Sequence, residues 1–500
     1  MSSKYVDLII PTGEATGFIP FPDGHGKPIT VIGTDSIRQS FDEKCLAQTL
    51  KSRCAPGVTD LVLNPDAHCG YGAPIGCVLV SPSHIYPGPV GVDIKCSMSL
   101  LQLDLPSEAI KDRSVRRAII EAILERTPTG AGKGQRSVKK ARRVDKESGF
   151  RVVTQGASQP VCQTLGIPYD WAKKCEDAYH VGHAGRKGDL ETRLEYLIRS
   201  NRFPGFYNKI MQLGSYGSGN HFGECEEVNV IKTEKAQATA QSFGLKDGHV
   251  AFLSHCGSRG FGFELAKAQF RLLQNKFSMW YIPLPGGDRE LVYAPIGTPE
   301  ANDYIDDMAL AGNFATVNHL LINALILEAF QEVFPGIDGK LVYIISHNIA
   351  RQEIIDEKVS WVHRKGATRA YPAGHFSLKG TDFYETGHPL LLPGNPKDGS
   401  VVMVAEEGAH KSCFSVNHGA GRALGRREAQ RTLDQQAVNQ QFYDQDILTN
   451  CRNYPKDEAP AAYKDFAEVI RSVELAQLAR QVATLKARFV IKDQDKTKRW

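Results

Sequence analysis

The chain has 500 residues, of which 42% are hydrophobic and 23% are charged, so it can bury a sizeable core. The 60 basic and 56 acidic residues leave a net charge of +4, which excludes a surface that is basic throughout but allows a local basic patch. No signal-peptide pattern, no disulfide spacing and no run of about 18 apolar residues is recognised. We therefore expect a cytoplasmic protein outside membranes, whose eleven cysteines are mostly buried thiols.

Short apolar runs, taken in chain order, predict strands that are buried on both faces. These runs begin at Asp60, Cys77, His249, Leu341 and Ser400. Helices are expected over residues 113–126, over 303–333 as one long or broken helix, and over 463–486, where apolar side chains form a rough stripe. Glycine and proline are spread along the chain without a repeat or a long linker. We therefore predict one large α+β or α/β domain over residues 1–500, with central packed β-sheets flanked by helices.

Residues with metal-binding side chains follow the predicted strands, in turn-rich sequence. Asp93 and Cys96 are three positions apart, so a bulge or turn is needed to direct both at one metal ion. His221, His255 and His347 lie in strand-like or glycine-rich segments, and imidazole is a common ligand of divalent transition metals. Each residue alone is more simply interpreted as a buried thiol, a solvated carboxylate or a core histidine. Together, and without a CxxC pair, they indicate a catalytic metal site with open positions.

His418 has a different setting, in the segment His-Gly-Ala-Gly-Arg. Gly419 and Gly421 allow the backbone to approach a ligand closely, and Arg422 and Arg426 are suited to bind phosphate. A neutral imidazole can attack phosphorus and form a covalent intermediate. The alternative is a helix N-terminus that binds an anion without covalent chemistry.

Nine segments, in their order along the chain, resemble the RtcB family of RNA-splicing ligases. They are residues 64–76, 91–96, 219–224, 254–260, 347–350, 363–369, 418–422, 458–464 and 490–492. The resemblance implies a single RtcB-like domain that joins RNA 3′-phosphate or 2′,3′-cyclic phosphate ends to 5′-hydroxyl ends, in RNA repair or tRNA splicing. GTP would be the co-substrate and two Mn²⁺ ions the cofactors.

The resemblance also implies a role for each candidate residue. The expected metal ligands are Asp93, Cys96, His221, His255 and His347, with Cys96 between the two ions. His418 matches the histidine that becomes guanylated. The expected nucleotide contacts are Asn220, Glu224, Tyr463, Lys492, Gly419 and Gly421, and the expected phosphate or RNA contacts are Arg259, Arg422 and Arg426. Lys492 would be brought to the site by the helix expected over residues 463–486.

The implied reaction opens a cyclic phosphate with activated water, guanylates His418, transfers GMP to the RNA 3′-phosphate and releases GMP when the 5′-hydroxyl attacks. Because the attack needs neutral imidazole, the reaction should fail at low pH. Two alternatives are a dinuclear metal phosphoesterase that uses no nucleotide and an RNA-binding paralogue without activity. His418 together with Asn220, Glu224 and Lys492 favours the ligase.

Three departures from the family pattern suggest a divergent paralogue. Cys69 stands where glutamine is usual, and Ser97 stands where glycine is usual. Residues 393–400 read Pro-Gly-Asn-Pro-Lys-Asp-Gly-Ser where the family has Pro-Gly-Ser-Met-Gly-Thr. Since this loop should contact the nucleotide, its change predicts altered handling of GTP or of RNA.

Residues 132–143 contain six basic residues and no acidic residue. Such a segment is either a solvated loop or a contact with the RNA backbone, driven by counterion release. In the second case, higher salt should weaken RNA binding more in the natural protein than in a variant with glutamines in this segment.

Overall fold

The apolar runs that predicted strands form the centres of two large sheets. The computed structural model describes residues 5–21, 24, 26–186 and 188–493. The five runs lie in β4 (Asp60–His68), β5 (Ile75–Ser81), β9 (His249–Cys256), β11 (Gly339–Ser346) and β16 (Gly399–Ala405). Nearly all of their side chains are buried, which confirms strands that are covered on both faces.

The eight-stranded sheet brings distant parts of the chain to one edge. Its strand order is β11-β7-β9-β8-β19-β16-β15, with β18 beside β19. The strands not yet introduced are β7 (Ser97–Pro106), β8 (Phe222–Val230), β15 (Pro389–Asn395), β18 (Leu448–Thr449) and β19 (Ala479–Lys492). Antiparallel pairing places His255 opposite both Met98 and Phe222, and Phe222 opposite Lys492. The starts of β7 and β8 therefore meet the ends of β9 and β19.

The seven-stranded sheet has the order β1-β2-β3-β4-β5-β13-β12. Its remaining strands are β1 (Ile10–Pro11), β2 (Thr16–Ile19), β3 (Ile29–Ile32), β12 (Asn348–Ile355) and β13 (Lys358–Lys365). Two small sheets pair β14 (Ala367–Arg369) with β17 (Ser415–Asn417), and β6 (His84–Ile85) with β10 (Ala294–Pro295). Since β11 continues through His347 into β12, the two large sheets are joined at that residue.

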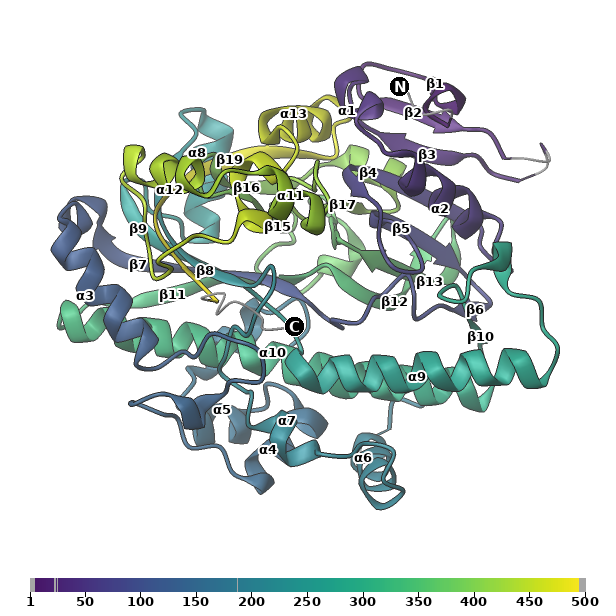
Figure 1. Cartoon of the computed structure of the whole chain (residues 1–500), viewed down its shortest axis with the longest axis horizontal. Coiled ribbons are helices and arrows are strands. Elements are labelled where there is room, and N and C mark those ends of the chain that lie inside the picture. Colours follow the sequence, from purple (N-terminus) through teal and green to yellow (C-terminus); the bar gives the residue numbers. More distant parts are fainter. Residues whose placement is uncertain (1–4, 22–23, 25, 187, 494–500) are drawn as a thin grey trace.

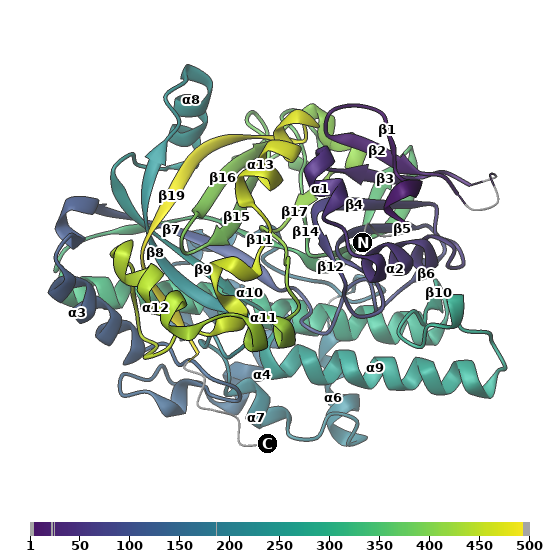
Figure 2. The same cartoon turned by 45° about the horizontal axis from the view of Figure 1, so that its top comes forward.

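Two long helices, α9 (Arg259–Met279) and α10 (Pro299–Val333), run side by side beneath the sheets (Figure 1). Shorter helices on that side are α3 (Arg113–Leu124), α4 (Lys146–Gln155), α5 (Gln159–Leu165), α6 (Asp189–Arg199) and α7 (Phe206–Ile210). The others are α1 (Asp35–Gln39), α2 (Glu43–Arg53), α8 (Glu234–Phe243), α11 (Arg426–Thr432), α12 (Gln435–Asp444) and α13 (Phe466–Leu475), most clearly seen in Figure 2. The mixed α and β content confirms the predicted fold class.

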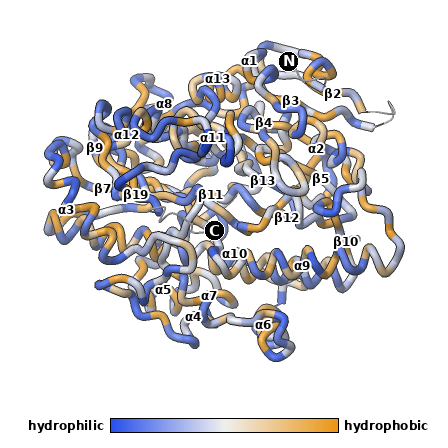
Figure 3. The backbone as a smooth tube through the Cα atoms, in the orientation of Figure 1, coloured by the Kyte–Doolittle hydropathy of each residue, from blue (hydrophilic) through white to orange (hydrophobic). Residues whose placement is uncertain are grey.

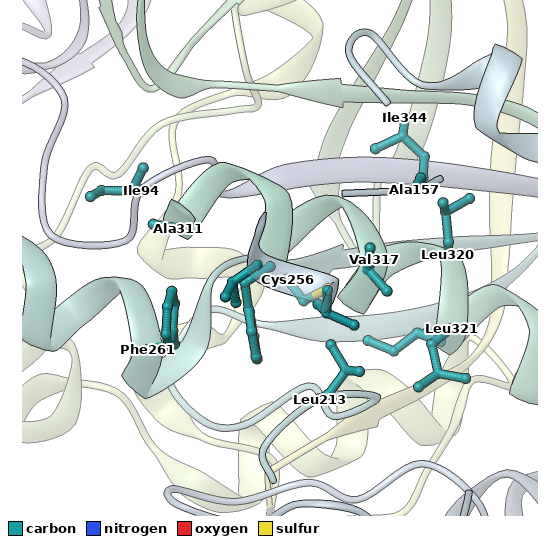
Figure 4. Packing of buried hydrophobic residues seen from close by; sticks show 14 of the residues in the cluster. Ile94, Ala157, Leu213, Cys256, Phe261, Ala311, Val317, Leu320, Leu321 and Ile344 are labelled. Carbon is teal, nitrogen blue, oxygen red and sulfur yellow. The ribbon is translucent and has the colours of Figure 1, made fainter. Parts of the chain in front are cut away.

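Helix α10 is one continuous helix of 35 residues, and it corrects the expectation that no segment is apolar enough to cross a membrane. By length and composition it qualifies, but 94% of its apolar window is buried within the protein. Ala311, Val317, Leu320 and Leu321 of α10 pack in the same cluster as Phe261 of α9 (Figure 4). Buried polar side chains interrupt the apolar run, as expected for the core helix of a globular fold.

The helix predicted over residues 463–486 is wrong in its second half. Helix α13 ends at Leu475, and Gln477 has a φ of 60°, which turns the chain out of the helix. From Ala479 the chain forms β19, which pairs with β8 on one side and β16 on the other. The apolar stripe fitted a helix, but ladders of backbone hydrogen bonds with β16 over residues 479–485 and with β8 over residues 483–492 stabilise a strand instead. The helix over residues 113–126 is confirmed by α3.

The distribution of hydrophobic residues follows this packing. The tube of α9 alternates between hydrophilic and hydrophobic residues, as expected for a helix with one buried face (Figure 3). Eight of the eleven cysteines are buried, as predicted. The single domain over residues 1–500 stays a prediction, and residues 1–4 and 494–500, at its two ends, lie outside the described residues.

Candidate metal centre and nucleophile

A turn before β7 directs Asp93 and Cys96 to the same point. Lys95 has a φ of 55°, a left-handed conformation that supplies the predicted turn. Lys95 N donates to Asn348 O at 2.6 Å, and His347 N donates to Cys96 O at 2.9 Å. These bonds connect the turn to the junction of β11 and β12, so the positions of Cys96 and His347 depend on each other.

Cys96 lies at the centre of two overlapping groups of metal-binding atoms. Its Sγ lies 3.1 Å from His255 Nε2 and 3.5 Å from His221 Nε2. On one side His255 Nε2 lies 3.2 Å from His347 Nε2, and on the other His221 Nε2 lies 2.8 Å from Asp93 Oδ2. All five predicted ligands are therefore brought together, in the groups Cys96–His255–His347 and Asp93–Cys96–His221, with Cys96 in both.

Burial keeps most of these groups uncharged. Burial lowers the pKa of His255 and of His347 far below that of an ordinary histidine, and neighbouring histidines lower it further. Burial also raises the pKa of the Cys96 thiol, and Asp93 adds to this effect. For Asp93 itself, burial raises the pKa, but His221 and Arg259 outweigh burial and lower it.

The donor set fits a metal ion because five side-chain atoms that can bind one converge at a single place. His255 Nδ1 lies 3.2 Å from Asn220 O, so we assign its hydrogen to Nδ1 and its lone pair to Nε2, which faces Cys96 and His347. His347 Nδ1 is buried without a hydrogen-bond partner among the described residues. One thiol, three imidazoles and one carboxylate suit divalent transition-metal ions.

His418 lies next to this donor set, with its ring centroid 4.7 Å from that of His347. Asp66 Oδ2 lies 2.7 Å from His418 Nδ1 and accepts a second hydrogen bond from its backbone N at 3.2 Å. Because Nδ1–H of His418 donates to the fully buried carboxylate of Asp66, Nε2 carries the lone pair of the ring. Asp66 was missed from the sequence; the available signal was a carboxylate within the apolar strand β4.

The two glycines after His418 are required by the protein's own backbone. A Cβ at Gly421, where φ is 72°, would lie 2.2 Å from Asp66 O, and one at Gly419 would lie 2.9 Å from Pro393 O. The backbone at Gly419 and Gly421 therefore closely approaches β15 and β4 of the protein itself. This packing holds His418 against Asp66.

One cavity of about 520 Å³ opens over the metal-binding residues and His418. That volume lies in the range of small-molecule sites. Its wall includes Asn220, Phe222, Lys365, Tyr463, Arg422 and Arg426. Of the three departures from the family pattern, Cys69 lines the cavity. The segment over residues 393–400 lines it through Pro393 and Gly394, at the end of β15, which keep the Pro-Gly of the family pattern.

Glu224 and Lys492 do not line this cavity but lie buried beside it. Lys492 is 1% exposed, and its Nζ lies 3.2 Å from Glu458 Oε2 and 5.7 Å from the ring of Phe222, a wall residue. Glu224 is 3% exposed, and its Oε1 has no hydrogen-bond partner among the described residues. Burial raises the pKa of Glu224 to about 8, although Lys492 opposes the rise. Lys492 reaches this place on strand β19, and not on the helix that we expected.

The arginines predicted to bind phosphate are paired with carboxylates. Arg422 NH1 lies 3.4 Å from Glu458 Oε1, and Arg426 NH1 lies 2.8 Å from Asp457 Oδ2 and also contacts Glu458. Tyr463 OH donates to Glu458 Oε2 at 2.8 Å. Burial raises the pKa of Glu458, but Lys492, Arg426 and Arg422 outweigh it and lower the pKa to about 2. The sequence did not predict Glu458 as the residue on which these side chains converge.

Arg259 and the basic segment over residues 132–143 also have partners within the protein. Arg259 NH1 lies 2.9 Å from His221 Nδ1, so it contacts a predicted metal ligand. In the segment over residues 132–143, half of the cations are in ion pairs: Lys139 with Glu125, Lys140 with Glu125 and Glu332, and Arg142 with Glu328. This pairing leaves Lys133, Arg136 and Arg143 for the predicted contact with an RNA backbone.

A family model described as tRNA-splicing ligase RtcB matches residues 48–493. The chain belongs to the RtcB family. Its similar proteins include a tRNA-splicing ligase RtcB from Pyrobaculum aerophilum (34% identical), one from Archaeoglobus fulgidus (33%) and one from Thermococcus kodakarensis (31%). Each comparison covers 91% of this chain and 92% of the relative. The RtcB resemblance drawn from nine short segments is thereby confirmed over nearly the whole chain.

Proposed function

We propose that this RtcB family member is a cytoplasmic RNA ligase that joins a 3′-phosphate or 2′,3′-cyclic phosphate end to a 5′-hydroxyl end, with GTP as co-substrate. The observation that carries the proposal is the position of the Asp66–His418 pair beside two metal-binding groups that share Cys96. The names of the relatives, all tRNA-splicing ligases, support RNA as the substrate. RNA repair or tRNA splicing is the process that we propose.

Two Mn²⁺ ions are the proposed cofactors. Asp93 and His221 would hold one ion, His255 and His347 the other, and Cys96 would be shared between them. Ions held there would offset negative charge on phosphoryl oxygens and lower the pKa of bound water. The choice of Mn²⁺ is supported by the convergence of carboxylate, imidazole and thiol atoms that can bind divalent transition-metal ions.

His418 is the proposed nucleophile. Its Nε2 lone pair forms a bond to the α-phosphorus of GTP, while the bond to the bridging oxygen breaks and pyrophosphate leaves. The Nδ1 hydrogen stays on the ring and bonds to Asp66, whose negative charge stabilises the positive charge that develops on the imidazole.

Two displacements complete the proposed reaction. An oxygen of the RNA 3′-phosphate attacks the same phosphorus and breaks the P–N bond, which regenerates His418 and leaves GMP on the RNA end. The 5′-hydroxyl oxygen then attacks the phosphorus of the 3′-phosphate, gives its proton to water and displaces GMP. Both steps gather negative charge on phosphoryl oxygens, so a cationic site favours them.

Glu224 is the proposed contact for guanine. Guanine presents N–H donors along one edge, and the unpartnered, buried Oε1 of Glu224 is suited to accept from them. Asn220 and Tyr463 line the cavity and would complete the nucleotide site together with Lys492. The altered hairpin over residues 393–400 would then modify the handling of GTP or of RNA.

The decisive experiment is incubation of the purified protein with α-³²P-labelled GTP and Mn²⁺. We expect an acid-labile adduct on the natural protein and on a His410→Ala control, since His410 is an exposed histidine. We expect none on His418→Ala. A protein that hydrolyses phosphoesters with Mn²⁺ but forms no adduct would be a metal phosphoesterase, and the ligase proposal would be abandoned. The Asp66–His418 pair favours the ligase, because hydrolysis by metal-bound water needs no such pair.

A further inference from the structure

One face of α9 carries exposed aromatic and basic side chains. Phe263, Lys267 and Arg271, which we call the α9 strip, are four positions apart and therefore follow one face of the helix over about 12 Å. Phe263 is 42% exposed, and Lys267 and Arg271 are exposed. Lys267 Nζ lies 5.7 Å from the ring centroid of Phe263. The strip contributes to neither the core nor the metal centre.

Helix α9 lies beside the cavity. Helix α9 begins at Arg259, which contacts His221, and it extends below the elements that line the cavity (Figures 1 and 2). Tyr71 lines the cavity, is 42% exposed, and packs edge-on against Phe270 of α9 with ring centroids 5.3 Å apart. A ring of the cavity wall therefore packs directly on α9, at the buried Phe270, which precedes Arg271 in the chain.

The charge of this face suits a polyanion. Glu264 is the one acidic residue within α9, and it is paired with Lys209 at 3.2 Å. Lys276, further along α9, is paired with Glu300 at 2.9 Å. Within the described part of the chain, no carboxylate lies within ion-pair distance of Lys267 or Arg271. Two unneutralised cations therefore lie beside the exposed ring of Phe263.

We propose that a single-stranded end of the RNA substrate lies along Tyr71 and the α9 strip as it enters the cavity. Bases would stack on the rings of Tyr71 and Phe263, and phosphates would contact Lys267 and Arg271. This inference rests on the proposed function, because it takes RNA as the substrate. Exposed rings beside cations select unpaired nucleotides, since bases within a duplex do not expose their faces.

The test measures binding of a fluorescent single-stranded RNA with a 3′-phosphate by anisotropy at several salt concentrations. A Lys267→Gln/Arg271→Gln variant should bind roughly 10-fold more weakly, and its slope of log affinity against log salt should be smaller by about 1.4. Phe263→Ala should bind roughly 10-fold more weakly with little change in slope, because stacking is lost and no charge is removed.

Matched controls separate the surface from general effects. Lys340→Gln/Lys358→Gln removes the same charge from exposed sites elsewhere, and Tyr281→Ala removes a ring that is 93% exposed just beyond the end of α9. Both controls should bind RNA like the natural protein. Thermal unfolding midpoints within about 2 °C of each other would show that all variants fold. Equal affinities for the strip variants and their controls, or tighter binding of a blunt duplex, would overturn the proposal.

Guanylation of His418 distinguishes this proposal from the proposed function. It needs GTP but no RNA, so every strip variant should form the adduct at the natural rate. If the natural protein forms no adduct but the strip variants lose RNA affinity, the ligase chemistry fails and the binding surface stands. If guanylation is normal and the strip variants bind RNA like the controls, the surface fails and the ligase stands.

Discussion

Asp66 and His418 are 352 positions apart in the chain, yet the carboxylate of one lies 2.7 Å from Nδ1 of the other. Asp66 belongs to β4 of the seven-stranded sheet, and His418 follows β17 of a two-stranded sheet. Gly421 permits this contact, because any side chain there would collide with the backbone of Asp66. The pair sets which nitrogen of His418 keeps its lone pair, and so links the fold to the proposed chemistry.

The first prediction concerns Asp66. Asp66→Asn should slow guanylation of His418 by roughly 100-fold or more, because the variant neither stabilises the developing imidazolium nor selects the reactive tautomer. Rapid-quench measurement of adduct formation checks this, with Mn²⁺ binding as the test of an intact site. A natural rate in Asp66→Asn would show that the pair has no part in the reaction.

The second prediction concerns the shared thiol. Cys96→Ser should bind less Mn²⁺ than the natural protein, because both metal-binding groups lose a ligand. Chelation with EDTA should lower the thermal unfolding midpoint of the natural protein, since a ligand that binds the folded state stabilises it. The midpoint of Cys96→Ser should change less. Cys69→Ser, at the cavity wall, is the control, and equal Mn²⁺ stoichiometry in both variants would reject the shared site.

The third prediction concerns Lys95, which is buried between the predicted ligands Asp93 and Cys96. Its Nζ donates to Asp177 O at 2.9 Å, lies 2.6 Å from His180 Nε2, and donates to Thr316 Oγ1 at 2.5 Å. These contacts tie the turn to α10 through Thr316 and to the segment that contains Asp177 and His180. Lys95→Met should therefore weaken Mn²⁺ binding by roughly 10-fold, as removal of supporting contacts does at other metal sites.

Isothermal titration with Mn²⁺ measures the effect in Lys95→Met. The control is Lys111→Met, which removes an exposed lysine far from the centre. The same affinity in both variants would mean that the turn holds its shape without the side chain of Lys95.

The fourth prediction separates binding from stability at Glu224. Its pKa in the folded protein is raised to about 8, mainly by burial, above the value of about 4.3 for an unfolded chain. Between pH values of about 4.3 and 8 this group ionises in the unfolded chain but stays protonated in the folded protein. The free energy of unfolding therefore falls as pH rises through this interval. Glu224→Gln removes this penalty, so the variant should be more stable than the natural protein at pH 8.5, while GTP should bind roughly 10-fold more weakly.

Urea unfolding at pH 5 and at pH 8.5 measures the first effect of Glu224→Gln, and fluorescent GTP titration measures the second. Lower stability of Glu224→Gln at pH 8.5 would contradict the raised pKa. Unchanged GTP affinity would exclude Glu224 from the nucleotide site.

The fifth prediction concerns acid. Burial lowers the pKa of His363 to about 4, below the value of about 6.5 for an unfolded chain. Below about pH 6.5 this histidine binds a proton in the unfolded chain but stays neutral in the folded protein. The free energy of unfolding therefore falls as pH falls. Between pH 6.5 and pH 5 the loss from this residue is about 2 kcal/mol.

His363→Gln should lose less stability than the natural protein over that pH interval. Unfolding midpoints measured at pH 7, 6 and 5 check this, with exposed His410→Gln as the control. A parallel decline in all three proteins would mean that the acid sensitivity arises elsewhere.

Local pattern was enough for much of the fold and for most of the candidate site. The apolar runs predicted β5, β9, β11 and β16, because a buried strand needs side chains that are apolar on both faces. The same reasoning failed over residues 463–486, where an apolar stripe fits a helix and a strand equally well. Pairing with β8 and β16, which are distant in the chain, decided between them.

By itself, the sequence determined the chemistry available to this protein: a thiol, a carboxylate, three imidazoles and a separate histidine, in or beside strand-like and glycine-rich segments. Only the tertiary structure decided which of these side chains meet. It placed Cys96 in both metal-binding groups, gave His418 its partner Asp66, and paired Arg422 and Arg426 with Glu458. The physical reason is that residue type sets what a side chain can bind. Its charge state and its partners depend on burial and on neighbours that are hundreds of positions away in the chain.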